Sequence, residues 1–488
     1  MADAASTTLK PIKKPDDPSG TSPAYDAMAP VWRKVDSVLG GTRAMRGAGR
    51  ELMPQHAEET DDAYQERLET SVLLNYTSLT LESWVGRPFS DPVEPNDDVP
   101  AVVQAILPDV DTLGTGLHSF CRDWFHSGVA KAFAHVLVDF PRTEQPEDRP
   151  RTLADDYREG VRPYWCLVQP EDLLYVRTAI VGGREVVTHA RIREVDVIPV
   201  GFSEVHVERI RVLDPGIVTL WEKRRASKSG KITWVEVARW ETGIKDQVPL
   251  VTFYSDRQGV MIGKPPIEDL VDLNVRHWQS TSDQISILTV SRFPMLALSG
   301  GINEDQELVI GPNQWLYTPD PSGRFYYVEH AGAAISAGRQ DLADLEEQMA
   351  LYGAEFLRRR PGNPTATARA LDSAESTSPL QDMVLRFTDS VARALDFTAQ
   401  WMGAGEVGGT VTIANEWGPE SLKGEDLVAL VETFKLGAIS KEVLLAEFKR
   451  RAILSDKFNV EEDAKRLIGR IPPFLQGPAK PGPGSGAQ

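Results

Sequence analysis

Three histidines and an aspartate are candidates for metal chemistry, because His118, His126, His135 and Asp139 lie in one short stretch of the chain. Imidazole and carboxylate groups are common metal ligands, so one hypothesis is a metal-dependent enzyme that acts on nucleic acid. The spacings of eight and nine residues do not place these side chains on one helical face, and His135 falls within a predicted strand. The pattern therefore favours separate structural roles, and we predict no catalytic residue, no metal site and no cofactor.

Other signatures of catalysis are missing or incomplete. The sequence contains no G-x-x-x-x-G-K-[ST], H-E-x-x-H, C-x-x-C or G-x-S-x-G motif. Gly114-Thr115-Gly116 could offer backbone N–H groups to a phosphate, but it lacks the rest of a dinucleotide site, which favours a helix-entry turn. The pairs Asp61-Asp62 and Glu346-Glu347 could hold a cation, but in a chain with 71 acidic residues solvated helix faces explain them better.

A run of three arginines, Arg358-Arg359-Arg360, begins a Pro/Gly-containing segment that includes Asn363. Two interpretations are open. Cations at the end of a helix offset its macrodipole, which is a purely structural role. Guanidinium groups on a flexible loop could also contact phosphates transiently.

Aromatic residues are dense in a short segment at about 298–335, namely Trp315, Tyr317, Phe325, Tyr326 and Tyr327. They outnumber what so short an insert needs for its own core. Aromatic side chains are enriched at interfaces, so contact between neighbouring copies of the chain is one interpretation. A self-contained hairpin core is the other.

The elements that must position these groups are three predicted helices. The first extends from Lys264-Pro265-Pro266 to Arg292, the second begins near Gly338, and the third covers Thr367–Met402. An insert with short strands, at about 298–335, separates the first two. The first helix has a wide apolar stripe that includes Ile267, Leu270, Val271, Val275 and Trp278. An ordinary enzyme core does not require this order of parts.

The preceding residues, 25–260, are predicted to form one α+β domain, with helices first and a mixed sheet second. We expect one continuous helix from Asp61 to Trp84, a buried strand at Ala134–Phe140 and a surface loop at 142–161. A strand at Gly409–Asn415 could join the earlier sheet, and helices follow over 420–470.

Composition limits the class of protein. The chain of 488 residues has a net charge of −18, which disfavours a protein that grips nucleic acid over much of its surface. It has no secretory signal and no apolar run long enough to span a bilayer, so we expect no membrane association. Its two cysteines are too few for a disulfide framework, which favours a reduced cytosolic setting.

In the order of its parts the chain resembles the portal proteins of tailed bacteriophages, in particular a portal-like family known as a domain of unknown function in phages and prophages. The resemblance covers about residues 25–460 and rests on the order of several short segments. These are Trp32–Val35, Leu39–Gly41, Tyr64–Leu68, Leu81–Phe89, Arg162–Tyr164, Pro249–Val251, Pro266–Asn274, Thr365–Ala368 and Gly437–Ser440.

The resemblance implies an α+β, multi-domain subunit with an α/β wing, a two-helix stem, a small β-containing clip, a long wing helix and a helical crown. The implied subunit begins with a disordered arm at 1–22 and a wing at 23–262, to which the strand 409–415 is added. The stem helices are at 263–297 and 337–357, and the clip at 298–336 lies between them. A tunnel loop at 358–367, the long wing helix at 368–403, the end of the wing with the crown at 404–471, and a disordered tail at 472–488 follow.

The resemblance also implies a function and partners. Such subunits form a ring, usually of twelve, at one capsid vertex of the virion, assembled in the bacterial cytoplasm. DNA is packaged and ejected through the ring without sequence specificity. Terminase, head-completion or adaptor proteins, the major capsid protein and scaffold would be partners. Arg358, Arg359, Arg360 and Asn363 would face the channel, the clip aromatics would contact partners or neighbouring subunits, and the apolar stripe of the first stem helix would contact neighbouring subunits. A structural adaptor or minor capsid protein is an alternative function.

Overall fold

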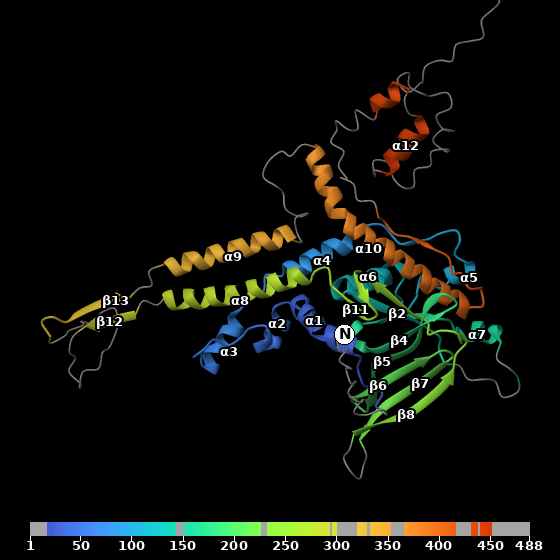
Figure 1. Ribbon diagram of the computed structural model, residues 1–488, viewed down its shortest axis with the longest axis horizontal. Coiled ribbons are helices and arrows are strands. Elements are labelled where there is room, and N and C mark those ends of the chain that lie inside the picture. The colour runs from blue at the N-terminus through green and yellow to red at the C-terminus, as the bar shows by residue number, and fades with distance from the viewer. Residues whose placement is uncertain are drawn as a thin grey trace, which may run out of the picture. The chain divides into compact units, whose positions relative to one another are not determined.

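The computed structural model describes residues 17–142, 149, 152–225, 232–292, 295–299, 320–328, 332–352, 366–415, 431–437 and 440–450 (Figure 1). The chain forms two compact units. One comprises Met1–Pro361 and Pro379–Asn415, and the other comprises Gly362–Ser378 and Glu416–Gln488. In the second unit the description covers the first part of α10 (Ala366–Trp401), the stretch 431–437 and α12 (Lys441–Arg450). As predicted, α12 begins directly after Ser440, whose hydroxyl accepts a hydrogen bond from the Val443 N–H at 3.3 Å.

The first unit begins with a group of helices: α1 (Pro23–Leu39), α2 (Gly41–Ala48), the 3-10 turn η1 (Gly49–Glu51), α3 (Asp61–Thr70) and α4 (Tyr76–Gly86). Helix α1 starts where Ser22 Oγ accepts the Tyr25 N–H at 3.0 Å. Trp32 is fully buried, and its Nε1 donates to the Lys131 carbonyl at 3.1 Å, which ties α1 to the end of α6 (Leu117–Lys131).

The helix predicted from Asp61 to Trp84 is two helices, because the chain is extended at Ser71 (φ −68°, ψ 139°). The Ser71 hydroxyl donates to the Arg67 carbonyl at 2.7 Å and so helps end α3. Asn75 then accepts the Ser78 N–H at 2.9 Å and starts α4. Ser and Asn side chains compete with helical hydrogen bonds in this way, and the apolar period alone does not reveal the break.

A short connection follows α4, with β1 (Glu94–Pro95) and α5 (Ala101–Gln104). Helix α6 (Leu117–Lys131) then leads into β2 (Phe133–Asp139), which is buried along its whole length, as the sequence predicts. Strand β2 is the centre of a three-stranded antiparallel sheet in the order β3-β2-β9, with β3 at Tyr164–Val168 and β9 at Leu250–Tyr254. Helix α7 (Leu153–Glu159) lies where a loop was predicted.

The second sheet has five strands in the order β4-β5-β6-β7-β8, and neighbours in sequence pair antiparallel. The strands are β4 (Leu173–Val181), β5 (Arg184–Val200), β6 (Ser203–Asp214), β7 (Ile217–Arg225) and β8 (Ile232–Glu241), and β4 follows the 3-10 turn η2 (Pro170–Asp172). The predicted mixed sheet is therefore two antiparallel sheets over the described residues. Strand β4 was not predicted; its outer half is exposed and lacks a buried apolar alternation.

A charged cluster joins the two sheets. Arg211 on β6 forms ion pairs with Asp139, at the end of β2, and with Glu194 on β5. Asp139 also accepts the Phe140 N–H at 2.8 Å and the Tyr164 hydroxyl at 3.2 Å. The Asp139 carboxylate is only 8% exposed, so it is enclosed at the junction of the two sheets beside Arg211.

The last part of the first unit contains β10 (Arg257–Gly259), β11 (Ile262–Gly263), α8 (Glu268–Ser291), β12 (Met295–Ser299), β13 (Arg324–Val328), α9 (Ala333–Tyr352), most of α10 and β14 (Val411–Thr412). The three predicted long helices correspond to α8, α9 and α10. Strand β14 pairs with β1, not with either larger sheet. Residues 17–22, predicted as part of a disordered arm, pass over β4, where the Ser22 N–H donates to the Leu174 carbonyl at 3.1 Å.

We expect the stability of this unit to depend on pH through Asp36. Lys131 Nζ lies 3.0 Å from Asp36 Oδ1 and also pairs with Glu171, so two carboxylates share one cation. Burial, with a hydrogen bond to Glu171, raises the pKa of Asp36 from 3.8 to about 6. Because the pKa of Asp36 is higher in the folded than in the unfolded chain, its protonated form stabilises the folded state below about pH 4. This contribution to the free energy of unfolding is lost as the pH rises through about 6.

Asp36→Asn should therefore raise the free energy of unfolding above pH 6 and leave it unchanged near pH 4. The gain should be about 1 kcal/mol or less, because the side chain is 47% exposed and solvent screens it. Urea unfolding at pH 4.5 and pH 8 measures this difference. A variant less stable than the parent at pH 8 would contradict it.

Candidate functional site

The pair of helices α8 and α9 is the candidate functional element. The two helices pack side by side, and the chain between them forms the antiparallel hairpin of β12 and β13 (Figure 1). Met295 pairs with Val328 near the helices, and Ser299 pairs with Arg324 farther along the hairpin. Helix α9 buries only Leu345 and Met349 among its residues, so most of it is at least partly accessible.

Polar contacts fix the register of α8 against α9. Asp341 on α9 accepts the Ser280 hydroxyl at 2.5 Å and lies 3.5 Å from Arg276. Gln284 Nε2 donates to the Ile335 carbonyl at 3.1 Å. Contacts between particular donors and acceptors are directional, so they specify one alignment of the two helices more sharply than an apolar seam would.

Helix α8 is also anchored to the amino-terminal helices. The fully buried Asn274 accepts the Thr77 N–H at 3.1 Å and the Thr77 hydroxyl at 3.0 Å, and it donates to the Leu74 carbonyl at 2.8 Å. Gln279 Nε2 donates to the Leu52 carbonyl at 2.8 Å. These contacts hold the helix pair on a fixed base.

The apolar stripe of α8 is largely covered by the chain itself. Ile267, Leu270, Val271 and Trp278 have no exposed surface, and only Val275 is half-buried. The stripe was expected to contact neighbouring subunits. Packing within one chain accounts for these four side chains, so they have no accessible surface left to offer a neighbour.

The other predicted site residues are only partly described. In the hairpin, Phe325 is half-buried, Tyr326 is 51% exposed, and Tyr327 pairs with Leu296 through the backbone. Trp315, Tyr317, Arg358, Arg359, Arg360 and Asn363 lie outside the described residues. For the arginine run, both the structural role and the phosphate-binding role therefore stay predictions. For the aromatics other than Phe325 and Tyr326, the interface and the hairpin-core interpretations also stay predictions.

The candidate metal ligands are placed apart. His135 is fully buried beside Thr252, with Nδ1 and Oγ1 2.9 Å apart, and burial lowers its pKa to about 3. His118 Nδ1 accepts the Val93 N–H at 3.2 Å, and His126 lies 3.7 Å from Glu82. Among the residues that the structure describes, no three His, Cys, Asp or Glu side chains are placed to hold a metal ion.

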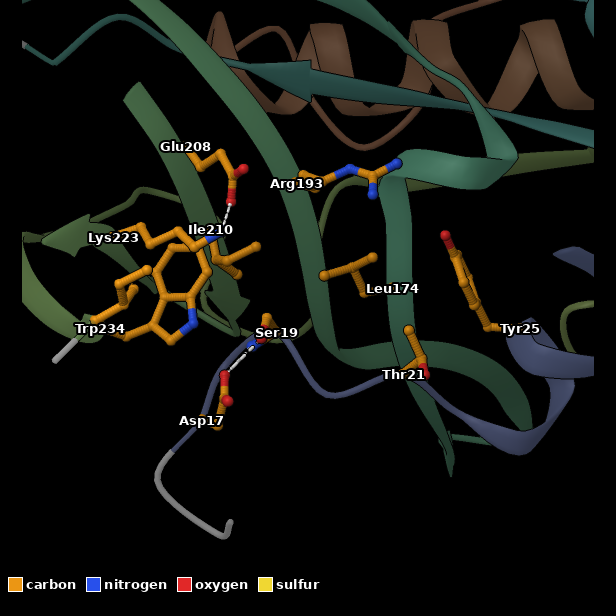
Figure 2. A pocket seen from close by; sticks show the side chains of 11 residues that line it. Asp17, Ser19, Thr21, Tyr25, Leu174, Arg193, Glu208, Ile210, Lys223 and Trp234 are labelled. Carbon is orange, nitrogen blue, oxygen red and sulfur yellow. Dashed lines mark hydrogen bonds and ion pairs between the residues drawn. The ribbon is translucent and has the colours of Figure 1, made fainter. Parts of the chain in front are cut away.

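A polar hollow on the five-stranded sheet was not predicted. It has a volume of about 390 Å³, and residues of the segment 17–21 line it beside Arg193, Glu208, Lys223 and Trp234 (Figure 2). Lys223 pairs with Glu208, and Arg193 lies 3.2 Å from Asp172. Because both cations are paired within the chain, the hollow is a mixed surface rather than a charged binding site.

Residues 266–402 match a family described as a domain of unknown function (DUF4055). This match covers under a third of the chain and corresponds to α8 through α10. No curated protein matches the chain. Within the described ranges, no helix combines the length and hydropathy needed to cross a membrane.

The solved structures that are similar to the chain include three from gene transfer agent particles, each with a low TM-score. The neck of an empty gene transfer agent particle, computed with C6 symmetry, has 12% identity and a TM-score of 0.38, over 87% of this chain and all of that one (100%). The neck of a native particle, computed with C12 symmetry, has 11% identity and a TM-score of 0.37, and the match covers 82% of this chain and 91% of that one. A chain of a native gene transfer agent virion has 11% identity and a TM-score of 0.37, and the match covers 88% of this chain and 99% of that one. These TM-scores are too low to establish a common fold.

Proposed function

We propose that this chain is a portal subunit of a tailed bacteriophage or prophage. In this proposal about twelve copies form a ring at one capsid vertex, and double-stranded DNA is packaged and ejected through its axis. The observation that carries the proposal is the unit of α8, the β12–β13 hairpin and α9, followed by the long helix α10. It has the order of stem, clip, stem and wing helix that the resemblance implies.

The charge of this unit supports a channel. Helix α9 carries four acidic residues (Asp341, Asp344, Glu346 and Glu347) and one arginine, Arg339, and the whole chain has a net charge of −18. An acidic wall repels DNA phosphates and keeps the polymer from adhering while it moves. In this proposal the arginines of the segment at 358–367 would be the cations that contact DNA.

The remaining parts follow from the same proposal. The β12–β13 hairpin, with Tyr326 exposed, would be the docking site for terminase and later for head-completion or adaptor proteins. The helical crown, at 420–470, would face the capsid interior, and the major capsid protein and scaffold would surround the ring. Neighbouring stems would touch through the accessible side of α8, where Val275 is half-buried, rather than through its buried stripe.

The native mass of the purified protein, measured with electron-microscope images of the same sample, tests this function. A closed ring of about twelve chains with a central hole is the expected result. A chain that remains a monomer or dimer, including in the presence of scaffold and capsid protein, would favour an adaptor and overturn the proposal. A monomer with metal-dependent nuclease activity would overturn it in favour of an enzyme.

The arginine run gives a separate prediction. Arg358→Ala, Arg359→Ala and Arg360→Ala combined should leave the ring intact, weaken its retention of double-stranded DNA at low salt, and make the salt dependence of retention shallower. Each phosphate contact that is lost removes about 0.9 from the slope of log K against log salt. Arg224→Ala with Arg225→Ala, which removes two exposed arginines on β7, should change neither quantity. Equal effects from both sets of variants would mean that the arginines affect DNA retention only through the overall charge of the chain, and would contradict a specific role for Arg358, Arg359 and Arg360.

A further inference from the structure

The hairpin between β5 and β6 ends in an exposed apolar tip. The two strands pair as far as Val200 and Ser203, which leaves Gly201 and Phe202 as a two-residue turn. Gly201 has a φ of +64°, as the first position of a tight hairpin turn requires. Phe202 follows it and is fully exposed, at 114% of its reference area. The turn therefore presents an exposed aromatic ring at the end of two paired strands.

Three aliphatic side chains extend this apolar surface. Ile198 and Val200 lie on one face of β5, and Val205 pairs directly with Ile198. Their exposed fractions are 39%, 56% and 50%. We call Ile198, Val200, Phe202 and Val205 the apolar tip. Contiguous exposed apolar side chains of this kind mark interaction surfaces in soluble proteins.

The same compact unit contains an apolar hollow of about 430 Å³. Its lining includes Val102 and Ile106 near α5, Phe140 after β2, Val161 after α7, and Trp401 and Met402 at the end of α10. The rings of Phe140 and Trp401 are stacked, with centroids 5.3 Å apart. Trp401 Nε1 donates to the Val138 carbonyl at 2.9 Å, so the indole is fixed in place. The hollow is thus pre-formed and aromatic.

We propose that the apolar tip of one copy inserts into the apolar hollow of the next copy. A hollow of a few hundred Å³ is large enough for an aromatic side chain with aliphatic neighbours, and aromatic anchors in such hollows dominate many interfaces. The tip and the hollow are different surfaces, so this contact is heterologous and repeats from copy to copy. Closure into a ring rests on the proposed function, whereas the contact itself does not.

Cross-linking between introduced cysteines tests the contact. Ser203→Cys and Ala105→Cys place one thiol beside the tip, with Phe202 kept, and one at the hollow, which Ala105 also lines. Both positions are exposed, so neither change should affect folding. A short bis-maleimide should then link full-length chains that carry both changes into a ladder that ends at the size of the ring. Native Cys121 is buried, and burial raises the pKa of Cys166 to about 12, so neither should react at neutral pH.

Two controls define the direction of the contact. A mixture of the two single variants should yield cross-linked dimers only, because each chain then has one reactive surface. Leu113→Cys, at a site 85% exposed in another loop, should give no ladder when combined with Ala105→Cys. A link inside one chain, or an equal ladder from the Leu113 variant, would overturn the inference.

The outcomes separate the two proposals. A closed ring that yields no ladder would refute the contact between tip and hollow and leave the portal function in place. A ladder without a closed ring would support the contact and count against the portal function. The absence of both a ring and a ladder would refute both.

Discussion

Arg211→Met is expected to lower the free energy of unfolding by about 3 kcal/mol. Arg211 joins the two sheets, because it pairs with Asp139 on β2 and with Glu194 on β5. Its removal leaves the Asp139 carboxylate, only 8% exposed, without a cation. An uncompensated buried charge is costly, whereas the loss of an exposed ion pair costs little. Urea unfolding monitored by tryptophan fluorescence measures the difference.

A neighbouring arginine supplies the control for this prediction. Arg224 lies on β7, is 55% exposed and pairs with Glu222. Arg224→Met should cost less than about 1 kcal/mol. Adding Asp139→Asn to Arg211→Met should restore part of the lost stability, because it removes the stranded charge. Equal losses in the two methionine variants, or no recovery in the double variant, would show that Arg211 does not join the sheets in this way.

Asn274→Leu is expected to destabilise the protein by about 3 kcal/mol. Leucine keeps the branch of the side chain at Cγ but has no polar atom, so the Thr77 N–H and the Leu74 carbonyl lose their partner. Each buried polar group that loses its hydrogen bond costs about 1–3 kcal/mol. Because these bonds hold α8 to the start of α4, protease cleavage in the segment 71–75 should also accelerate. Denaturant unfolding and limited proteolysis measure the two effects.

Gln279→Leu is the matched control on the same helix. Gln279 makes one hydrogen bond, to the Leu52 carbonyl, and is half-buried. Its loss should cost about 1 kcal/mol and should not expose the 71–75 segment. If both variants were equally unstable, the anchoring of α8 would be distributed along the helix rather than concentrated at Asn274. Under the proposed function, Asn274→Leu should also reduce ring assembly, because the stem would lose its fixed base.

The metal-site hypothesis shows what a sequence cluster cannot establish. His118, His126, His135 and Asp139 are near in sequence, and their residue types suit a metal. In the folded chain His135 is buried beside Thr252, and Asp139 binds Arg211 from a strand far along the chain. Only the tertiary structure supplied the partners that occupy these groups.

The sequence by itself determined those helices and strands whose patterns lie within a few neighbouring residues. The apolar period and the flanking prolines predicted α8, and a similar period predicted α9. A helix was also predicted at α10, after the Pro/Gly-containing segment, and a mostly apolar stretch predicted β2. These signals depend on residues a few positions apart, so they survive without knowledge of the fold. The order of those elements also carried the resemblance from which the proposed function starts.

The tertiary structure decided which surfaces meet. The stripe of Ile267, Leu270, Val271 and Trp278 was visible in the sequence, but periodicity reports that a face is apolar and not what covers it. Here the same chain covers it. Conversely, Phe202 follows a glycine in an ordinary alternating stretch, and only the pairing of β5 with β6 places it, uncovered, at a hairpin turn. Burial depends on contacts between distant segments, and no local pattern encodes those contacts.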